Sequence, residues 1–188
     1  MPVWFESIQI PTDPTAETSS PGIGGFAEGV LDGYKDRLAH AFTAPDPSKK
    51  PTTIIILDGF LLLGKSMCML QPYLDIKLLL RSSFSSTKCR REARAGYTVD
   101  DSGGWWVDPE GYVEDVVWPG YVEEHAFLFD GGDVEGNVRE DVARDRGVEV
   151  GPLWVEGGGK EVGLGEVLGW VVDVVVVRRV GEGLRDSG

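Results

Sequence analysis

Cysteine and histidine are scarce in this chain. Two cysteines, Cys68 and Cys89, and two histidines, His40 and His125, are the only ones among its 188 residues. Two isolated thiols make no disulfide framework, and the four side chains lack the spacing of zinc ligands. We therefore expect neither a zinc site nor structural disulfides, and a cytoplasmic, reducing environment.

Long apolar runs and basic residues are also few. The most apolar late segment, 167–177, contains Asp173 and is shorter than the roughly 18 apolar residues of a membrane span. The first residues show no basic stretch followed by an apolar run, so no secretory signal is expected. The net charge of −13 repels nucleic acid and anionic membranes, and we expect neither as a partner. The oligomeric state is left open.

The remaining composition, 41% hydrophobic and 26% charged, is typical of one globular domain. Residues 11–25 and 43–52 are rich in Pro, Ser, Thr and Gly or interrupted by proline, which predicts loops. Between them, apolar side chains recur at every fourth position and predict an amphipathic helix. Its stripe is Phe26, Val30, Tyr34, Leu38 and Phe42.

Strands and helices alternate in the second part of the sequence. Continuous apolarity at Ile54–Leu57 predicts a strand buried on both faces. Further strands are expected at 76–80 and 153–155. A helix is expected at 87–95, capped by Ser85-Ser86, and another at 119–128, beginning at Pro119. A third helix is expected at 164–180, where a valine-rich strand is the alternative. This order predicts an α/β fold, a parallel sheet flanked by helices in three layers.

The stretch Gly59–Ser66 matches the phosphate-loop pattern G-x-x-x-x-G-K-[ST] and follows a predicted strand. A phosphate loop turns its backbone N–H groups toward an anion, which favours small or polar residues inside it. Phe60 and the three leucines that follow favour burial instead. We interpret the stretch as a strand end that runs into a buried turn; a true phosphate loop in another nucleotide-binding fold is the alternative.

Asp58 ends the first predicted strand. A carboxylate at the carboxyl end of a parallel strand points into the crevice where α/β proteins bind ligands, and there it can hold Mg²⁺. The alternative is an aspartate that only stabilises a turn with Gly59.

A cluster of basic residues stands out in this acidic chain. Residues 88–94 contain Lys88, Arg90, Arg91 and Arg94, and on a helix Arg90 and Arg94 lie one turn apart. Guanidinium groups bind phosphate oxygens in pairs and stabilise a transferring phosphoryl group. A solvated basic face at a helix C-terminus is the alternative.

Several short motifs follow one another in an order that resembles a known family. They are Asp58-Gly59-Phe60-Leu61-Leu62, the arginine helix, Gly96-Tyr97-Thr98, Trp105–Tyr112 and Trp118-Pro119-Gly120-Tyr121. Over about residues 53–129 this order is similar to the nicotinamide riboside kinases, relatives of the uridine kinases among the phosphate-loop kinases. The resemblance implies ATP and Mg²⁺ as cofactors, a nucleoside as substrate, and a role in NAD biosynthesis.

The resemblance also implies roles for individual residues. Arg90 and Arg94 match arginines that contact the ATP phosphates in the family. Asp58 matches a carboxylate near Mg²⁺, and these three residues form the expected catalytic group. Arg91, Tyr97 and Thr98 match positions beside the nucleoside. Glu156, Gly157 and Gly158 match a loop that touches adenine, and the stretch Phe129–Gly132 competes for the same role.

The family pattern has parts that this sequence lacks. A glycine-rich phosphate loop, a catalytic aspartate on the next strand and an aromatic-Asp pair for the ribose have no counterpart in residues 1–52. We expect an incomplete gene or truncated form, or else a remnant that has lost catalysis. The chain is expected to divide into a poorly matched segment, 1–52, and a kinase-like core, 53–180, whose lid region lies at about 85–117. Such a chain is expected to be inactive and poorly stable alone. A non-catalytic interaction protein is the alternative.

Overall fold

The computed structural model describes residues 30–42, 53–98, 104–156 and 159–185. Side chains are described throughout these ranges except at 97–98 and 179–185. The longer elements, in chain order, are α1 (Val30–Phe42), β1 (Lys77–Leu79), α2 (Phe84–Glu92), β2 (Tyr97–Thr98), β3 (Trp105–Trp106), α3 (Trp118–His125), α4 (Glu140–Arg146), β4 (Val148–Val150) and α5 (Leu164–Arg185). The short helical turns are η2 (Lys65–Met67), η3 (Gln71–Tyr73), η4 (Val113–Val117), η5 (Ala126–Leu128) and η6 (Asp130–Gly132).

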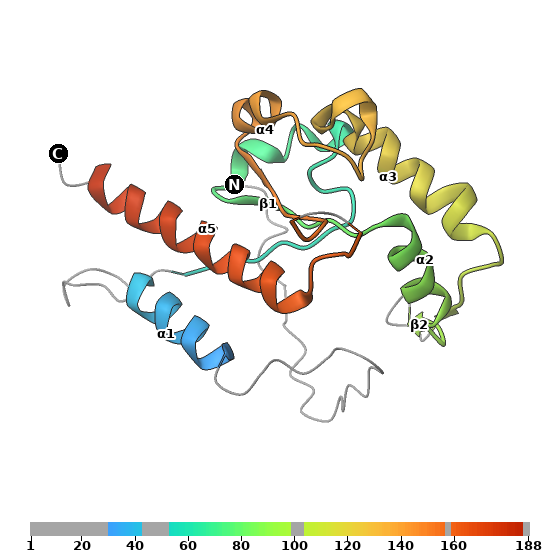
Figure 1. Cartoon of the computed structure of the whole chain (residues 1–188), viewed down its shortest axis with the longest axis horizontal. Coiled ribbons are helices and arrows are strands. Elements are labelled where there is room, and N and C mark those ends of the chain that lie inside the picture. Colours follow the sequence, from blue (N-terminus) through green and yellow to red (C-terminus); the bar gives the residue numbers. More distant parts are fainter. Residues whose placement is uncertain (1–29, 43–52, 99–103, 157–158, 186–188) are drawn as a thin grey trace.

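A parallel pair of strands, β1 and β4, lies at the centre of the molecule (Figure 1). Lys77 faces Val148 and Leu79 faces Val150. The chain enters β4 directly from α4 through Gly147, whose φ of 64° is the left-handed conformation that glycine adopts at a helix end. The strand predicted at 76–80 is therefore confirmed, whereas its partner β4 was not anticipated.

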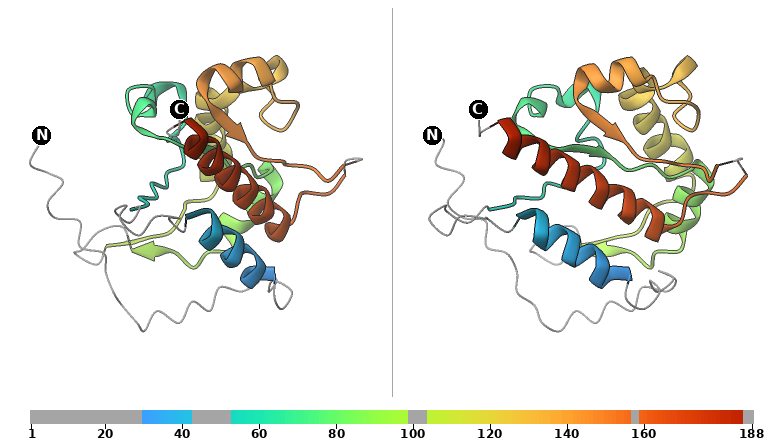
Figure 2. Two further views of the ribbon diagram at one scale, coloured as in Figure 1. Left: turned by 90° about the vertical axis from the view of Figure 1, so that its left-hand side faces the viewer. Right: turned by 60° about the vertical axis from the view of Figure 1, so that its left-hand side comes forward.

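The main core lies between this strand pair and the helices α3 and α4. Leu128 and Phe129 are fully buried there, packed with Leu79 of β1 and Val148 of β4. The helices α5 and α1 lie on the other side of the strands, an order that the two views of Figure 2 share. The structure is thus a layered mixture of helices and a small parallel sheet.

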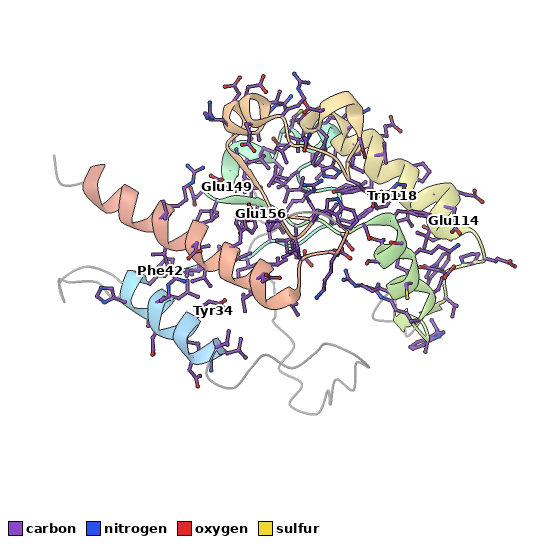
Figure 3. The ribbon with its side chains drawn as sticks, in the orientation of Figure 1. Tyr34, Phe42, Glu114, Trp118, Glu149 and Glu156 are labelled. Carbon is purple, nitrogen blue, oxygen red and sulfur yellow. The ribbon has the colours of Figure 1, made fainter. Side chains whose placement is uncertain are left out.

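The helices α1 and α5 pack side by side, although they come from distant parts of the chain (Figure 2). The Tyr34 hydroxyl donates a hydrogen bond to the Gly165 carbonyl at 3.3 Å, and Arg37 forms an ion pair with Asp173. A side chain at Gly169 would meet the Tyr34 hydroxyl at 2.7 Å, so glycine permits this close approach. Tyr34 and Phe42 lie on the face of α1 turned toward α5 (Figure 3). Both predicted helices are confirmed over the described residues; Phe26 lies outside them.

The first predicted strand is wrong. Ile54–Leu57 runs through the structure without strand pairing, and Ile55 and Ile56 are 86% and 88% exposed. A strand requires a neighbour for its N–H and C=O groups, and none of the described residues supplies one to this segment.

Two other elements differ from the prediction. Residues 153–155 form no strand, only a bridge between Trp154 and Glu161. The helix predicted at 87–95 begins earlier, because the Ser83 hydroxyl accepts a hydrogen bond from the Ser86 N–H and caps α2. The helix predicted from Pro119 is confirmed, with that proline in the first turn of α3.

The described residues contain two small sheets of two strands each, β1 with β4 and β2 with β3. The mixed α/β class of the prediction is confirmed, and the larger three-layer sheet stays a prediction. None of the described helices is both long enough and apolar enough to cross a bilayer.

Candidate functional site

The basic cluster of the sequence lies on α2. The helix begins at the Ser83 cap and ends at Glu92, so Arg90 and Arg91 belong to its last turn, where cations are favoured by the helix dipole. Arg94 follows after the helix has ended. The predicted one-turn spacing of Arg90 and Arg94 on a single helix is therefore wrong, because the helix is three residues shorter at its end than expected.

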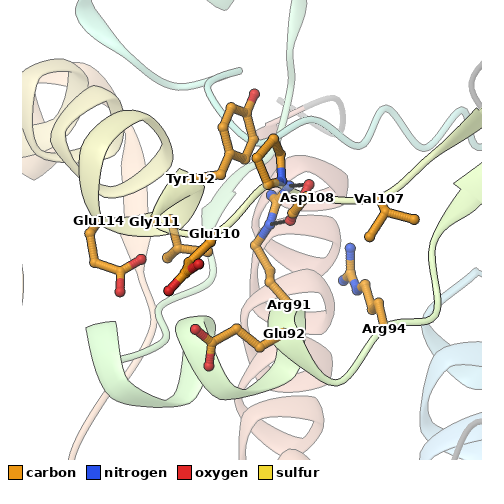
Figure 4. Close-up of a pocket in the computed structure, with 11 residues that line it drawn as sticks. Arg91, Glu92, Arg94, Val107, Asp108, Glu110, Gly111, Tyr112 and Glu114 are labelled. Atoms are coloured by element: carbon orange, nitrogen blue, oxygen red, sulfur yellow. Dashed lines mark hydrogen bonds and ion pairs between the residues drawn. The ribbon is translucent and has the colours of Figure 1, made fainter.

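A pocket of about 140 Å³ lies between the end of α2 and the segment that leads into η4. Figure 4 shows Arg91 and Arg94 directed toward this segment from the same side. The pocket is lined by Arg91, Glu92, Arg94, Val107, Asp108, Pro109, Glu110, Gly111, Tyr112, Val113 and Glu114. Basic, acidic and aromatic side chains thus meet in one small space.

Arg91 is held by Asp108 through two hydrogen bonds. Its Nε lies 2.7 Å from Oδ2 and its Nη2 lies 3.1 Å from Oδ1. The indole N–H of Trp106 donates to the same carboxylate at 2.9 Å, and the Arg91 guanidinium lies 5.9 Å from the centre of the Tyr112 ring. The hydrogen bonds from Arg91 lower the pKa of Asp108, and the one from Trp106 adds to this effect. Arg91 is thereby fixed in orientation.

The other two arginines have different surroundings. Arg90 is exposed and its Nη1 donates to the Ser82 hydroxyl at 2.9 Å, away from the residues that line the pocket. Arg94 lines the pocket, and it makes no ion pair with any residue in the described ranges. Of the three, Arg94 therefore offers its guanidinium to an incoming anion most directly.

Lys88 joins α2 to η4. It forms ion pairs with Glu92, at 3.6 Å, and with Glu114. The hydrogen bond between Lys88 and Glu114 raises the pKa of the lysine and lowers the pKa of the glutamate. This contact holds the two walls of the pocket together.

Tyr97 and Thr98, predicted beside the nucleoside, form β2. Tyr97 pairs with Trp106 and Thr98 with Trp105 of β3, so the backbone of both residues lies next to the pocket wall. Their side chains are outside the described part of the structure. The preceding Gly96 has a φ of 117°, and a Cβ there would lie 2.5 Å from the Trp105 indole nitrogen, so only glycine is tolerated.

Asp58 is exposed in the extended segment before the turn at Phe60. It forms no ion pair within the described ranges, which also contain no group of three metal-binding side chains. A single carboxylate is nevertheless compatible with Mg²⁺, which binds nucleotide sites through one or two carboxylates and the phosphates themselves.

Residues of the stretch that matches the phosphate-loop pattern bind carboxylates of α3. The Ser66 N–H donates to Glu124 Oε2 at 2.8 Å, and Lys65 forms a 3.2 Å ion pair with Glu123. A Cβ on Gly64 would lie 2.6 Å from Glu124 Oε2, so the glycine permits this approach. Leu63 is buried in the core, as predicted, whereas the predicted burial of Phe60 is wrong, since its side chain is 53% exposed. The backbone N–H that a phosphate would need is taken by a carboxylate.

The loop predicted to touch adenine is described only at Glu156, which is exposed; Gly157 and Gly158 lie outside the described residues. Figure 3 places Glu156 apart from Glu114 and hence from the pocket. The competing stretch begins at Phe129 in the core and turns at η6. The chain segments that flank the two stretches meet, because the Trp154 indole donates to the Glu135 carbonyl at 2.9 Å.

The sequence alone did not single out Asp108, Tyr112 or Glu114 as site residues. Asp108 stands in the quoted Trp105–Tyr112 motif, and its charge, opposite to that of the arginine cluster, was the available signal. The pairing itself depends on the turn that brings residue 108 back to residue 91, and no local pattern encodes that.

Comparison with known proteins finds relatives for this layered α/β chain with an arginine-lined pocket. It is 38% identical over 105 residues to a nicotinamide riboside kinase of Schizosaccharomyces pombe, covering 56% of this chain and 44% of the relative. It is 39% identical over 83 residues to one of Saccharomyces cerevisiae, covering 44% and 33%. It is 35% identical over 111 residues to one of Eremothecium gossypii, covering 59% and 41%. No family model and no solved structure matches.

These relatives are kinases, which is the class of protein that the chain resembles. More specifically, the chain is similar to nicotinamide riboside kinases over about half of its length, as its motifs indicated. It spans less than half the length of each of these curated relatives.

Proposed function

We propose that this chain is part of an ATP-dependent kinase that phosphorylates the 5′-hydroxyl of nicotinamide riboside and forms nicotinamide mononucleotide. The observation that carries the proposal is the pocket at the end of α2, where Arg94 faces the cavity beside the fixed Arg91. A guanidinium without an ion-pair partner in the described ranges suits a phosphate group, and the aromatic Tyr112 suits a flat ring.

In this proposal Arg94 and Arg90 contact the ATP phosphates and Asp58 helps to hold Mg²⁺. Arg91 lies near the nucleoside, with Tyr97 and Thr98, and residues 156–158 contact adenine. Bound Mg²⁺ neutralises charge on the transferring phosphoryl group. The same proposal divides the chain into a segment 1–52 and a core 53–180. It also places the protein in the cytoplasm, because two free, exposed thiols suit a reducing compartment.

We further propose that the chain alone is inactive. Its only G-x-x-x-x-G-K-[ST] stretch has its Ser66 N–H and Lys65 engaged by carboxylates of α3. Positioning and charge stabilisation supply nearly all the catalysis of phosphoryl transfer, so a chain without an available phosphate loop is expected to transfer phosphate extremely slowly.

Nucleotide binding and catalysis can be tested separately. ATP and adenosine binding to the full chain would be measured by calorimetry, for the wild type and for Arg94→Ala. Loss of a charged phosphate contact is expected to weaken ATP binding roughly tenfold and to leave adenosine binding unchanged. Arg144→Ala, at an exposed arginine of α4 remote from the pocket lining, is the matched control.

Catalysis would be tested in a chimera that joins the N-terminal part of the Schizosaccharomyces pombe relative to this chain. Formation of nicotinamide mononucleotide by the chimera, abolished by Arg94→Ala, supports the proposed activity. A folded chimera that binds ATP and forms no product contradicts it, and product formation by the unextended chain contradicts the proposed inactivity.

A second candidate function is a non-catalytic interaction protein. It is favoured by the exposed row Ile54–Leu57, because an uncharged, β-branched segment with unpaired backbone can add to the sheet of another chain. Association that depends on this row and not on Arg94 would support this candidate over the kinase.

A further inference from the structure

The first turn of α2 is held by two glutamates from remote parts of the chain. The Ser83 N–H donates to Glu161 Oε1 at 3.0 Å, and the Phe84 N–H donates to Glu135 Oε1 at 2.9 Å. The Ser86 hydroxyl donates to the other oxygen of Glu161. Two backbone N–H groups at the start of the helix are therefore satisfied by carboxylates, which also favour the positive end of the helix dipole.

These glutamates each follow, by three residues, one of the two stretches that compete as the adenine loop. Glu161 closes the turn that begins at Trp154, since the two residues form a β-bridge. Glu135 follows the turn after Phe129, and the Trp154 indole donates to its carbonyl. Residues that flank both stretches thus meet each other and the beginning of the arginine helix at one place.

Glu161 is well suited to fix this junction. Burial alone would raise its pKa, but the hydrogen bonds from Ser86, Ser83 and Ser82 lower it, with help from the charge of Arg90. The carboxylate therefore stays ionised near neutral pH. Arg90 is in turn bonded to Ser82, so the same serine-rich turn links the carboxylate to one of the arginines.

We propose that Glu161 is a positioning residue that docks the Trp154–Glu161 bridge onto the first turn of α2 and so sets the orientation of the arginines at the other end of that helix. The inference rests on the proposed function for its nucleotide. Because α2 is a single helix of nine residues, the placement of its first turn also sets the placement of Arg91 and of the segment that carries Arg94. Glu135 also stabilises the first turn of α2, more weakly, through its one hydrogen bond with the Phe84 N–H.

The test compares Glu161→Gln with Glu161→Asp and with Glu140→Gln, at an exposed glutamate of α4. Hydrogen exchange of the α2 amides in the full chain is expected to become roughly fivefold faster in Glu161→Gln, the usual effect of losing a helix cap. Glu161→Asp should restore part of the protection, and Glu140→Gln should change nothing.

Binding provides a measurement that a purely structural role would not change. In Glu161→Gln, ATP affinity should fall severalfold further than adenosine affinity, since both ligands carry adenine but only the phosphates of ATP meet the arginines. Unchanged exchange in α2, or an equal loss of ATP and adenosine affinity, overturns the inference. If the wild type binds no ATP, the proposed function fails, and exchange alone decides whether Glu161 orients α2.

Discussion

His125 is a titratable side chain enclosed in the core. It is fully buried, its ring lies 4.6 Å from that of Tyr121, and its Nδ1 lies 3.0 Å from the Tyr121 carbonyl. Its Nε2 has no hydrogen-bond partner among the described residues. Burial lowers the pKa of His125, although the Tyr121 carbonyl and the charge of Glu124 act in the opposite direction. The neutral ring is therefore the form that the folded protein holds.

We expect His125 to make stability sensitive to mild acid. With its pKa lower in the folded than in the unfolded chain, its contribution is complete above about pH 6.5 and is lost as the pH falls toward the folded pKa. The free energy of unfolding should fall by up to about 1.4 kcal/mol per pH unit in that interval. Urea unfolding between pH 5 and 7.5 measures this, and the slope should flatten in His125→Phe but persist in His40→Phe, at an exposed position of α1.

Asp108 gives a second prediction at the residue scale. Asp108→Asn keeps the shape of the side chain but removes the charge that holds Arg91, and should cost roughly 1 kcal/mol of unfolding free energy. Because the pKa of Asp108 is lowered, its contribution is present above about pH 4 and is lost below it. The difference between wild type and variant should therefore disappear in acid. Asp75→Asn, at an exposed aspartate, serves as control, and an equal loss in both variants would argue against the pair.

Among the elements, α1 depends most on one contact, its packing on α5. Tyr34→Ala removes both the half-buried ring and the hydrogen bond to Gly165, and hydrogen exchange of 30–42 should accelerate at least tenfold. The neighbouring Gly33→Ala should act in the opposite sense. A Cβ there meets nothing within 4 Å, and alanine is favoured in a helix by up to about 1 kcal/mol. Equal exchange in the two variants would contradict the described packing.

The elements also show what the sequence could predict. The stripe of Val30, Tyr34, Leu38 and Phe42 repeats at helical spacing, and Pro119 marks the start of α3, so local patterns were sufficient for both helices. Ile54–Leu57 has the composition of a buried strand, but strand formation depends on a neighbour that local sequence cannot guarantee.

In the candidate site, too, one part could be predicted from the local sequence and another part could not. The basic cluster predicted an arginine-bearing helix, and the structure places two of its three arginines at a pocket. The carboxylates that bind the end and the start of this helix, Asp108 and Glu161, lie 17 and more than 70 residues away from their partners Arg91 and Ser83. Their contacts follow from the fold rather than from spacing.

For the whole molecule, the exposed row Ile54–Leu57 and the net charge of −13 oppose each other. The row favours association between chains, and the charge repels it. We expect the mass measured by light scattering to rise with salt, since screening weakens the repulsion. Ile55→Lys should keep the chain monomeric at all salt concentrations with little change in stability, because Ile55 is 86% exposed.

Met69→Lys is the matched control, at a side chain that is 85% exposed and outside the row. Association that persists in Ile55→Lys, or that is abolished equally by Met69→Lys, would mean that the row is not the contact surface.

The packing of α1 on α5 has a consequence for synthesis. About 120 residues separate Phe42 from Leu164, so during translation α1 emerges roughly ten seconds before its partner. Throughout that interval its apolar stripe has no native surface to cover it. A nascent chain paused between the two helices should therefore bind chaperones through α1, and release them only once α5 has left the ribosome.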